Sequence, residues 1–135
     1  MKRSKKVMEN YVCPECWNQI QNCTCEFYPP WHLVMVDVGV QEIVRTLNKK
    51  GYNTTGCCES HFDGNPNLYV AFAQNYDIGL PEGFSYIKGK MTINYYFKKN
   101  ELATKEKYEK IKAEKLDTML TWAKSLPENP RRFRR

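Results

Sequence analysis

Four cysteines lie within 13 residues near the start of the chain, and this cluster constrains the fold more than any other feature. Cys13 and Cys16 are separated by two residues, and Cys23 and Cys25 by one. Both spacings let a pair of thiolates reach one ion, and four soft thiolates favour tetrahedral Zn²⁺. We therefore predict one zinc ion held by Cys13, Cys16, Cys23 and Cys25. An iron–sulfur cluster is the alternative that the same four thiolates allow.

This zinc ion is expected to be structural. Four protein thiolates close the coordination shell, so no position stays open for a substrate. A segment this short buries little apolar surface, and metal binding would supply its folding free energy. No apolar stretch follows the basic residues 1–6, which argues against a secretory signal. We expect a reducing, cytoplasmic location, where clustered cysteines hold metal more often than they form disulfides.

Length and charge predict one domain with basic ends. No apolar run reaches the ~18–20 residues of a transmembrane helix, so no membrane partner is expected. Residues 1–6 and 131–135 each carry four basic side chains, and the chain between them holds 13 Lys/Arg against 15 Asp/Glu. Such ends can bind phosphate backbones or serve only as solubilising tails. The expected organisation is a disordered basic arm at 1–10, a zinc knuckle and connector at 11–31, an α+β domain at 32–126 and a basic tail at 127–135.

Apolar patterning in the body predicts several strands and two helices. Helical spacing marks residues 40–50, with Gly51 as the C-terminal cap, and residues 101–126, which Pro127 ends. Strand composition marks five segments: 32–40, 52–55, 68–73, 84–88 and 90–97. We expect an α+β fold in which an N-terminal four-cysteine zinc knuckle sits on a mainly antiparallel sheet, with two helices packed on one face.

The segment Gly51–His61 contains the densest group of reactive side chains in the body, and we expect it to enter a turn. Its chemistry is open to several interpretations. Cys58 and His61 can form a nucleophile–base dyad. Cys57 or Cys58 can bind a further metal ion with His61, with or without His32.

Two other interpretations of this segment involve no metal and no reaction. Hydroxyl groups, the imidazole and backbone N–H groups can bind phosphate or another polar group, which predicts a ligand-binding loop of Thr54, Thr55, Ser60 and His61. The plainer alternative is that Cys57 and Cys58 are small core residues.

Residues Cys13–Trp31, Gly51–His61, Leu68–Phe72 and Trp122 form a wider pattern. A cysteine cluster and a Tyr/Pro/Trp connector precede a Gly-Tyr-x-Thr…Cys-Cys…His segment, a later strand and a Trp-containing terminal helix. This pattern resembles uncharacterised small zinc-binding proteins of Firmicutes and their phages. The resemblance implies a phage or mobile-element protein of the host cell cytoplasm, with antagonism of host defence as its role.

A second pattern consists of Tyr52, Thr54, Thr55 and Cys58 after a helix. It is similar to a segment of the tRNA wybutosine-synthesis methyltransferase family. That resemblance implies an α+β fold. The chain has no glycine-rich loop of the kind that would bind a methyl donor.

Three functions follow from these features. The one we favour is a zinc-stabilised binding protein that engages a host complex, a nucleotide or nucleic acid. The second is an enzyme acting on a nucleotide or modified RNA through Cys58 and His61. The third is a nucleic-acid-binding regulator that uses its basic tails. No acid–base pair can be placed in the sequence, so we assign no catalytic residue, and the oligomeric state stays open.

Overall fold

The computed structural model describes residues 9–25, 33–87 and 91–129 of the chain. Within these ranges the fold is α+β, as predicted: two helices, two antiparallel sheets and short 3₁₀ segments. The elements, in chain order, are β1 (Tyr11–Val12), η1 (Ile20–Asn22), β2 (Val34–Met35), η3 (Val38–Val40), α2 (Gln41–Lys49), β3 (Thr54–Glu59), β4 (Leu68–Phe72), β5 (Ser85–Ile87), β6 (Thr92–Tyr95), η4 (Lys99–Leu102) and α3 (Lys105–Ser125).

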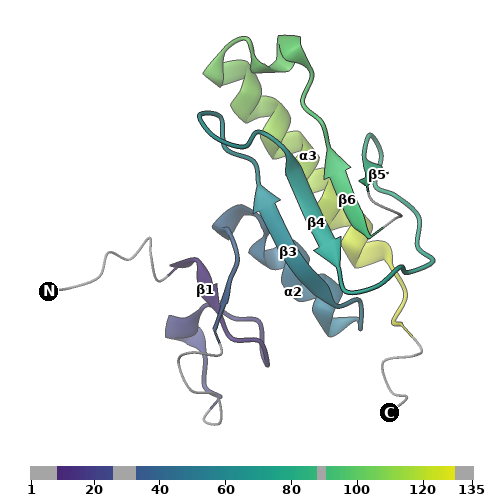
Figure 1. Ribbon diagram of the computed structural model, residues 1–135. Helices are drawn as coiled ribbons and strands as arrows, with labels where there is room; N and C mark the ends of the chain where they lie inside the picture. The colour runs from purple at the N-terminus through teal and green to yellow at the C-terminus, as the bar shows by residue number, and fades with distance from the viewer. Residues whose placement is uncertain (1–8, 26–32, 88–90, 130–135) are drawn as a thin grey trace, which may run out of the picture.

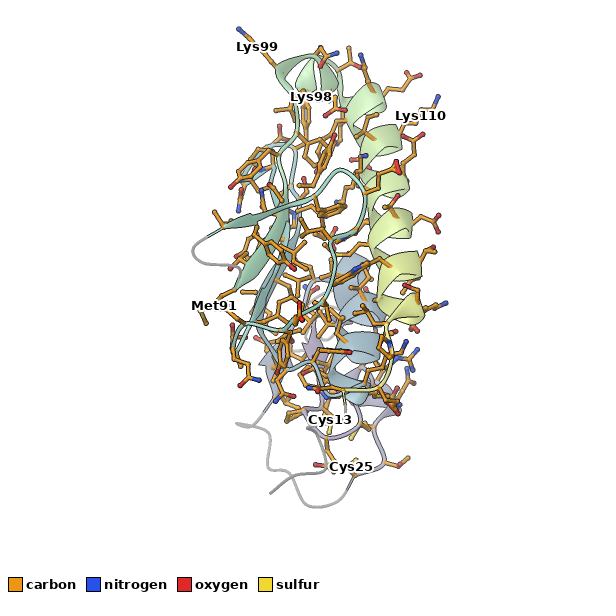
Figure 2. The ribbon with its side chains drawn as sticks, turned by 90° about the vertical axis from the view of Figure 1, so that its right-hand side faces the viewer. Cys13, Cys25, Met91, Lys98, Lys99 and Lys110 are labelled. Carbon is orange, nitrogen blue, oxygen red and sulfur yellow. The ribbon has the colours of Figure 1, made fainter. Side chains whose placement is uncertain are left out.

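The main sheet has four antiparallel strands in the order β3-β4-β6-β5. Figure 1 shows α2 and α3 behind this sheet. Figure 2, turned by 90°, shows both helices together on one side and the strands on the other. The two helices therefore cover one face of the sheet, and the core lies between them and the strands.

Strand β4 shows why the sheet has this register. Its buried side chains alternate with partly exposed ones, as expected for a strand with one face on a core. The buried ones are Leu68, Val70 and Phe72. In β3, Cys57 lies opposite Val70 and Cys58 lies opposite Tyr69. Directly opposed residues share a face, so Cys57 points toward the helices and Cys58 toward the other side of the sheet.

Both predicted helices are present, and local chemistry sets their ends. The longer helix starts at Lys105 instead of 101, because the Thr104 hydroxyl accepts the N–H of Lys107 at 3.1 Å and caps the first turn. The shorter helix ends at Lys49, and Gly51 follows its C-cap residue Lys50 with a φ of 94°, the left-handed conformation expected of a glycine that ends a helix.

Lys50 ties the ends of the two helices together. Its ammonium group donates to the carbonyls of Ala123 at 3.1 Å, Lys124 at 2.6 Å and Leu126 at 2.5 Å. These carbonyls lie at the C-terminal end of α3, where a positive charge is favourable. The contact fixes the position of α3 across the sheet.

The predicted strand at 32–40 is wrong for most of its length. Only β2 is extended, and the chain then enters η3 with a hydrogen bond from the Val40 N–H to the Asp37 carbonyl at 3.0 Å. β2 pairs with β1, outside the main sheet. His32 lies outside the described residues.

The cysteine segment is joined to the body by this small sheet. Val12 of β1 is 1% exposed and belongs to the same core cluster as the helices. The boundary predicted between residues 31 and 32, between the zinc knuckle with its connector and the α+β domain, lies outside the described residues and stays a prediction.

Glu101 closes the turn that precedes α3. Its carboxylate accepts the Lys98 N–H at 2.9 Å and the Tyr95 hydroxyl at 2.7 Å. Burial alone would raise the pKa of Glu101, but these hydrogen bonds outweigh it and hold the pKa below its ordinary value of 4.5.

We expect Glu101→Gln to lower the free energy of unfolding by about 1 kcal/mol at neutral pH, the typical net value of one hydrogen bond. Because the folded-state pKa is depressed, the carboxylate's contribution is present above the unfolded pKa and is lost as the pH falls through the folded value. Urea denaturation of both proteins across the acidic range should therefore show their stabilities converging at low pH. A difference that grows on acidification would contradict this role for Glu101.

Candidate functional site

The four N-terminal cysteines meet at one point of the structure. Their sulfur atoms all lie within 4.8 Å of one another, so they can hold a metal ion. Cys13 is buried, and Cys16, Cys23 and Cys25 are half-buried. Figure 2 shows Cys13 and Cys25 at one end of the molecule, opposite the end that carries Lys98 and Lys99.

Backbone geometry around Cys13 forms a tight knuckle. The Cys13 carbonyl accepts the Trp17 N–H at 2.7 Å, and the Cys13 N–H donates to the Asn18 carbonyl at 3.0 Å. Trp17 has a φ of 61°, a left-handed conformation that costs a non-glycine residue about 1–3 kcal/mol. Such a cost persists only where the surroundings demand the turn, and here the chain after Trp17 returns to Cys13 through the Asn18 carbonyl.

Two sulfurs of the cluster accept backbone hydrogen bonds in the same way. The Glu15 N–H points at the Cys13 sulfur (3.4 Å), and the Cys25 N–H points at the Cys23 sulfur (3.3 Å). In both cases the donor lies two residues after the acceptor. Donors of this kind stabilise thiolates and orient them toward an ion.

The protonation of the cluster fits a cation site. Burial raises the pKa of Cys13, but backbone hydrogen bonds from Cys16 and Glu15 outweigh it and the net shift is downward. Burial and hydrogen bonds with the sulfurs of Cys16, Cys23 and Cys13 raise the pKa of Cys25 to about 12. Four packed thiols therefore cannot all ionise together by themselves. A divalent cation would supply the missing positive charge.

The strand predicted at 52–55 is present in part as the start of β3, but the turn predicted at Cys57–His61 begins later than expected, because β3 continues to Glu59. The Thr54 and Thr55 side chains favour extended structure, and β4 offers pairing partners to every residue of β3 except Thr55, where the register shifts. The chain turns only after Glu59. As a result, Thr54 and Thr55 start the strand, while Ser60 and His61 follow its end, about 20 Å away at ~3.3 Å per residue.

The proposed ligand hydroxyls are thus not gathered at one place. Thr54 is hydrogen-bonded to the Asn48 side chain. The Asn48 amide donates to the Thr54 hydroxyl at 2.9 Å and accepts the Thr54 N–H at 3.2 Å. The Ser60 hydroxyl is fully buried and lies 2.8 Å from the Tyr108 hydroxyl. Of the four predicted ligand-binding residues, Thr55 and His61 have exposed side chains.

Ser60 forms the bend that ends β3. Its φ is 81°, its hydroxyl donates to the Pro66 carbonyl at 2.6 Å, and its own carbonyl accepts from Lys112 at 2.8 Å. Residues three apart on a regular strand point to opposite faces. The left-handed bend at Ser60 interrupts that alternation, and it brings Cys58 and His61 to the same side.

A third side chain, Asp37, joins Cys58 and His61. The three ligating atoms lie within 4.8 Å of one another. Oδ2 of Asp37 lies 3.1 Å from Nε2 of His61, and it accepts the Glu59 N–H at 3.1 Å on the open edge of β3. Asp37 was not among the residues predicted from the sequence. Its one signal is that it is a carboxylate within the apolar run of residues 33–40.

The surroundings of Cys57 and Cys58 disfavour the thiolate form, which is the nucleophilic one. Burial and then the negative charge of Asp37 raise the pKa of Cys57 to about 11. Burial also raises the pKa of Cys58, and the Asp37 and Glu59 carboxylates add to the shift. In a Cys–His dyad the partner lowers the thiol pKa, so this environment argues against nucleophilic catalysis by Cys58.

His61 lies between two hollows of the surface. The first, about 430 Å³, is bounded by the loop after β3 and the N-terminal half of α3; its lining includes Phe62, Lys105 and Lys112. The second, about 530 Å³, is bounded by acidic side chains, including Asp37 and Glu59. A ligand in either hollow could contact the imidazole.

Comparison with protein-family models, curated proteins and solved structures finds no match to this chain. Neither helix in the described residues is both long and apolar enough to cross a bilayer.

Proposed function

We propose that this protein is a zinc-stabilised binding protein that recognises a phosphate-bearing ligand, a nucleotide or nucleic acid. The structural zinc ion would be held by Cys13, Cys16, Cys23 and Cys25. The ligand would occupy the 430 Å³ hollow between the loop after β3 and α3, called here the α3 hollow. The observation that carries the proposal is the combination of aromatic, imidazole and ammonium groups on its walls.

The chemistry of the α3 hollow suits a nucleotide. Phe62 and His61 offer faces on which a base can stack, and such stacking is worth about 1–3 kcal/mol per base. Lys105 is exposed at the first turn of α3, where the helix dipole also favours negative charge. Asp63 and Glu109 line the same hollow and can accept hydrogen bonds from base amino groups or ribose hydroxyls.

The end of the molecule remote from the cysteine cluster carries three exposed lysines. Lys98 precedes η4 and Lys99 is the first residue of η4, and both are exposed. Lys110 is exposed on the outer side of α3. Figure 2 shows all three at the end of the molecule remote from the cysteine cluster. A longer nucleic acid could continue from the hollow across this end, held by its phosphates.

Binding of nucleotide or nucleic acid can be tested with ATP and a short fluorescent single-stranded RNA, titrated at low and physiological salt. We expect Lys105→Glu to weaken binding and to reduce the salt slope by about one. Lys124→Glu makes the same charge change on an exposed residue at the other end of α3, and it should have little effect.

Removing residues 1–6 and 131–135 separates this mode from a tail-driven one. We expect Lys105→Glu to weaken binding in the truncated protein as it does in the full-length chain. The proposal would be refuted if neither probe bound, if Lys124→Glu and Lys105→Glu had equal effects, or if removal of the tails alone abolished binding. The last result would favour the tail-driven regulator.

The resemblance to small proteins of Firmicutes and their phages suggests a biological setting. A phage or mobile-element protein in the host cytoplasm could bind a host complex directly, or it could bind the nucleotide that such a complex needs. Either action would antagonise host defence. Purification from the natural host followed by native mass spectrometry tests this setting. The absence of both a retained nucleotide and a copurifying host component would count against it.

A further inference from the structure

We infer a second metal centre formed by Asp37, Cys58 and His61, separate from the four-cysteine cluster. It would hold one zinc-like divalent ion through a carboxylate oxygen, a thiolate and an imidazole, with a fourth position open. This centre does not depend on nucleotide binding in the α3 hollow.

The distances suit one ion. Metal–ligand bonds of about 2.0–2.3 Å in a tetrahedron place ligand atoms about 3.3–3.8 Å apart. The three candidate ligand atoms lie within 4.8 Å of one another, with Asp37 and His61 at 3.1 Å. Small side-chain rotations would close the set, and both residues have room for them, since the side chains of Asp37 and His61 are 26% and 51% exposed.

The Cys58 sulfur has the same backbone environment as the cluster sulfurs. It accepts the Ser60 N–H at 3.4 Å, from a donor two residues later in the chain. The Cys13 and Cys23 sulfurs accept hydrogen bonds with this same spacing. Three cysteines in two separate places thus share the arrangement that supports a metal-bound thiolate.

Backbone strain gives an independent indication. In the described residues, Trp17 and Ser60 are the non-glycine residues with positive φ. Trp17 follows Cys16, and Ser60 lies between Cys58 and His61. Ser60 is held in this conformation by Tyr108 and by the Pro66 carbonyl, so the fold sustains a strained bend whose geometric result is to bring a thiol and an imidazole together.

The three ligands favour one kind of ion, and they leave its fourth coordination position open to solvent. Mixed sulfur, nitrogen and oxygen donors suit Zn²⁺, with Co²⁺ as a spectroscopic substitute, better than Mg²⁺ or Ca²⁺. Asp37 and His61 also line the acidic hollow of about 530 Å³, so a water molecule or an anionic oxygen could reach the fourth position from there. Three protein ligands and one exchangeable position distinguish this centre from a closed structural site.

The test is the zinc stoichiometry of the full-length chain, equilibrated with a small excess of Zn²⁺ in a reducing buffer, desalted and measured by elemental analysis. We expect two ions per chain for the unmodified protein and one for Cys58→Ser and for Asp37→Asn. Cys57→Ser and Asp63→Asn replace the same residue types nearby and should keep two. His32→Gln should also keep two, because the other histidine is the ligand.

Co²⁺ spectra identify the second site directly. The difference between the unmodified protein and Asp37→Asn should show charge transfer from a single thiolate, while the four-thiolate spectrum of the cluster remains in both. Retention of that spectrum also shows that the variant is folded. This centre would be overturned if the unmodified protein bound only one ion. It would also be overturned if Asp37→Asn and Asp63→Asn each lost one ion, or if His32→Gln lost one.

Discussion

Cys13→Ser is expected to remove the metal ion from the four-cysteine cluster and to cause a large loss of stability. Cys13 is 1% exposed and lies next to Val12, which packs in the common core. Binding at a free zinc concentration a thousandfold above Kd stabilises a folded protein by about 4 kcal/mol. Most of that stabilisation should disappear with the ion.

Thermal unfolding with and without a chelator measures this effect. The chelator should lower the melting temperature of the unmodified protein by more than that of Cys13→Ser, which has already lost the ion of the four-cysteine cluster. Cys57→Ser is the matched control, because it replaces a half-buried cysteine outside the cluster and should keep its chelator response. A Cys13→Ser protein with full metal content and an unchanged melting temperature would contradict a structural role for the cluster.

Tyr108→Ala is expected to lower the free energy of unfolding by about 3–5 kcal/mol, as for other large aromatic residues truncated in a core. Tyr108 is 0% exposed, and its ring packs against Phe62 and Phe97 at centroid distances of 5.1 Å. Its hydroxyl also holds Ser60 in the bend after β3. The substitution would therefore loosen both α3 and the loop that carries His61.

Tyr108→Phe separates the ring from the hydroxyl. It keeps the packing and should cost about 1–3 kcal/mol, because the buried Ser60 hydroxyl loses one of its partners. It should also weaken zinc binding at Asp37, Cys58 and His61 about 10-fold, as other losses of supporting contacts do. Urea denaturation and zinc competition test both effects. A loss below about 1 kcal/mol for Tyr108→Ala would mean that α3 is not anchored through this residue.

The periodic parts of the fold were predictable from the sequence. In β4, Leu68, Val70 and Phe72 alternate with small or polar-tipped side chains, and this period of two belongs to a strand on a core. The helical spacing of Ile43 and Leu47 marked α2 in the same way. Periodicity identifies an element when the element is long enough to repeat.

Short and irregular elements lacked such a signal. β1 and β2 contain two residues each, so their pairing depends on tertiary contacts that no local pattern reveals. The reactive side chains around Cys57 suggested a turn, but pairing with β4 overrode that local preference.

The two candidate metal sites also differ in how far they could be predicted from the sequence. The cysteine cluster was predictable because its ligands are close together in the sequence. Asp37 was not, because it reaches Cys58 and His61 only through the fold, at the open edge of β3. A turn between Cys58 and His61 was expected, but the positive φ of Ser60 was not, since serine has no preference for it.

Native mass spectrometry of the full chain, purified under reducing conditions, tests the central claim most directly. The account predicts bound zinc in the unmodified protein and one ion fewer in Cys13→Ser. An unmodified protein with no bound metal, or one lighter by two hydrogens through a disulfide among Cys13, Cys16, Cys23 and Cys25, would contradict it.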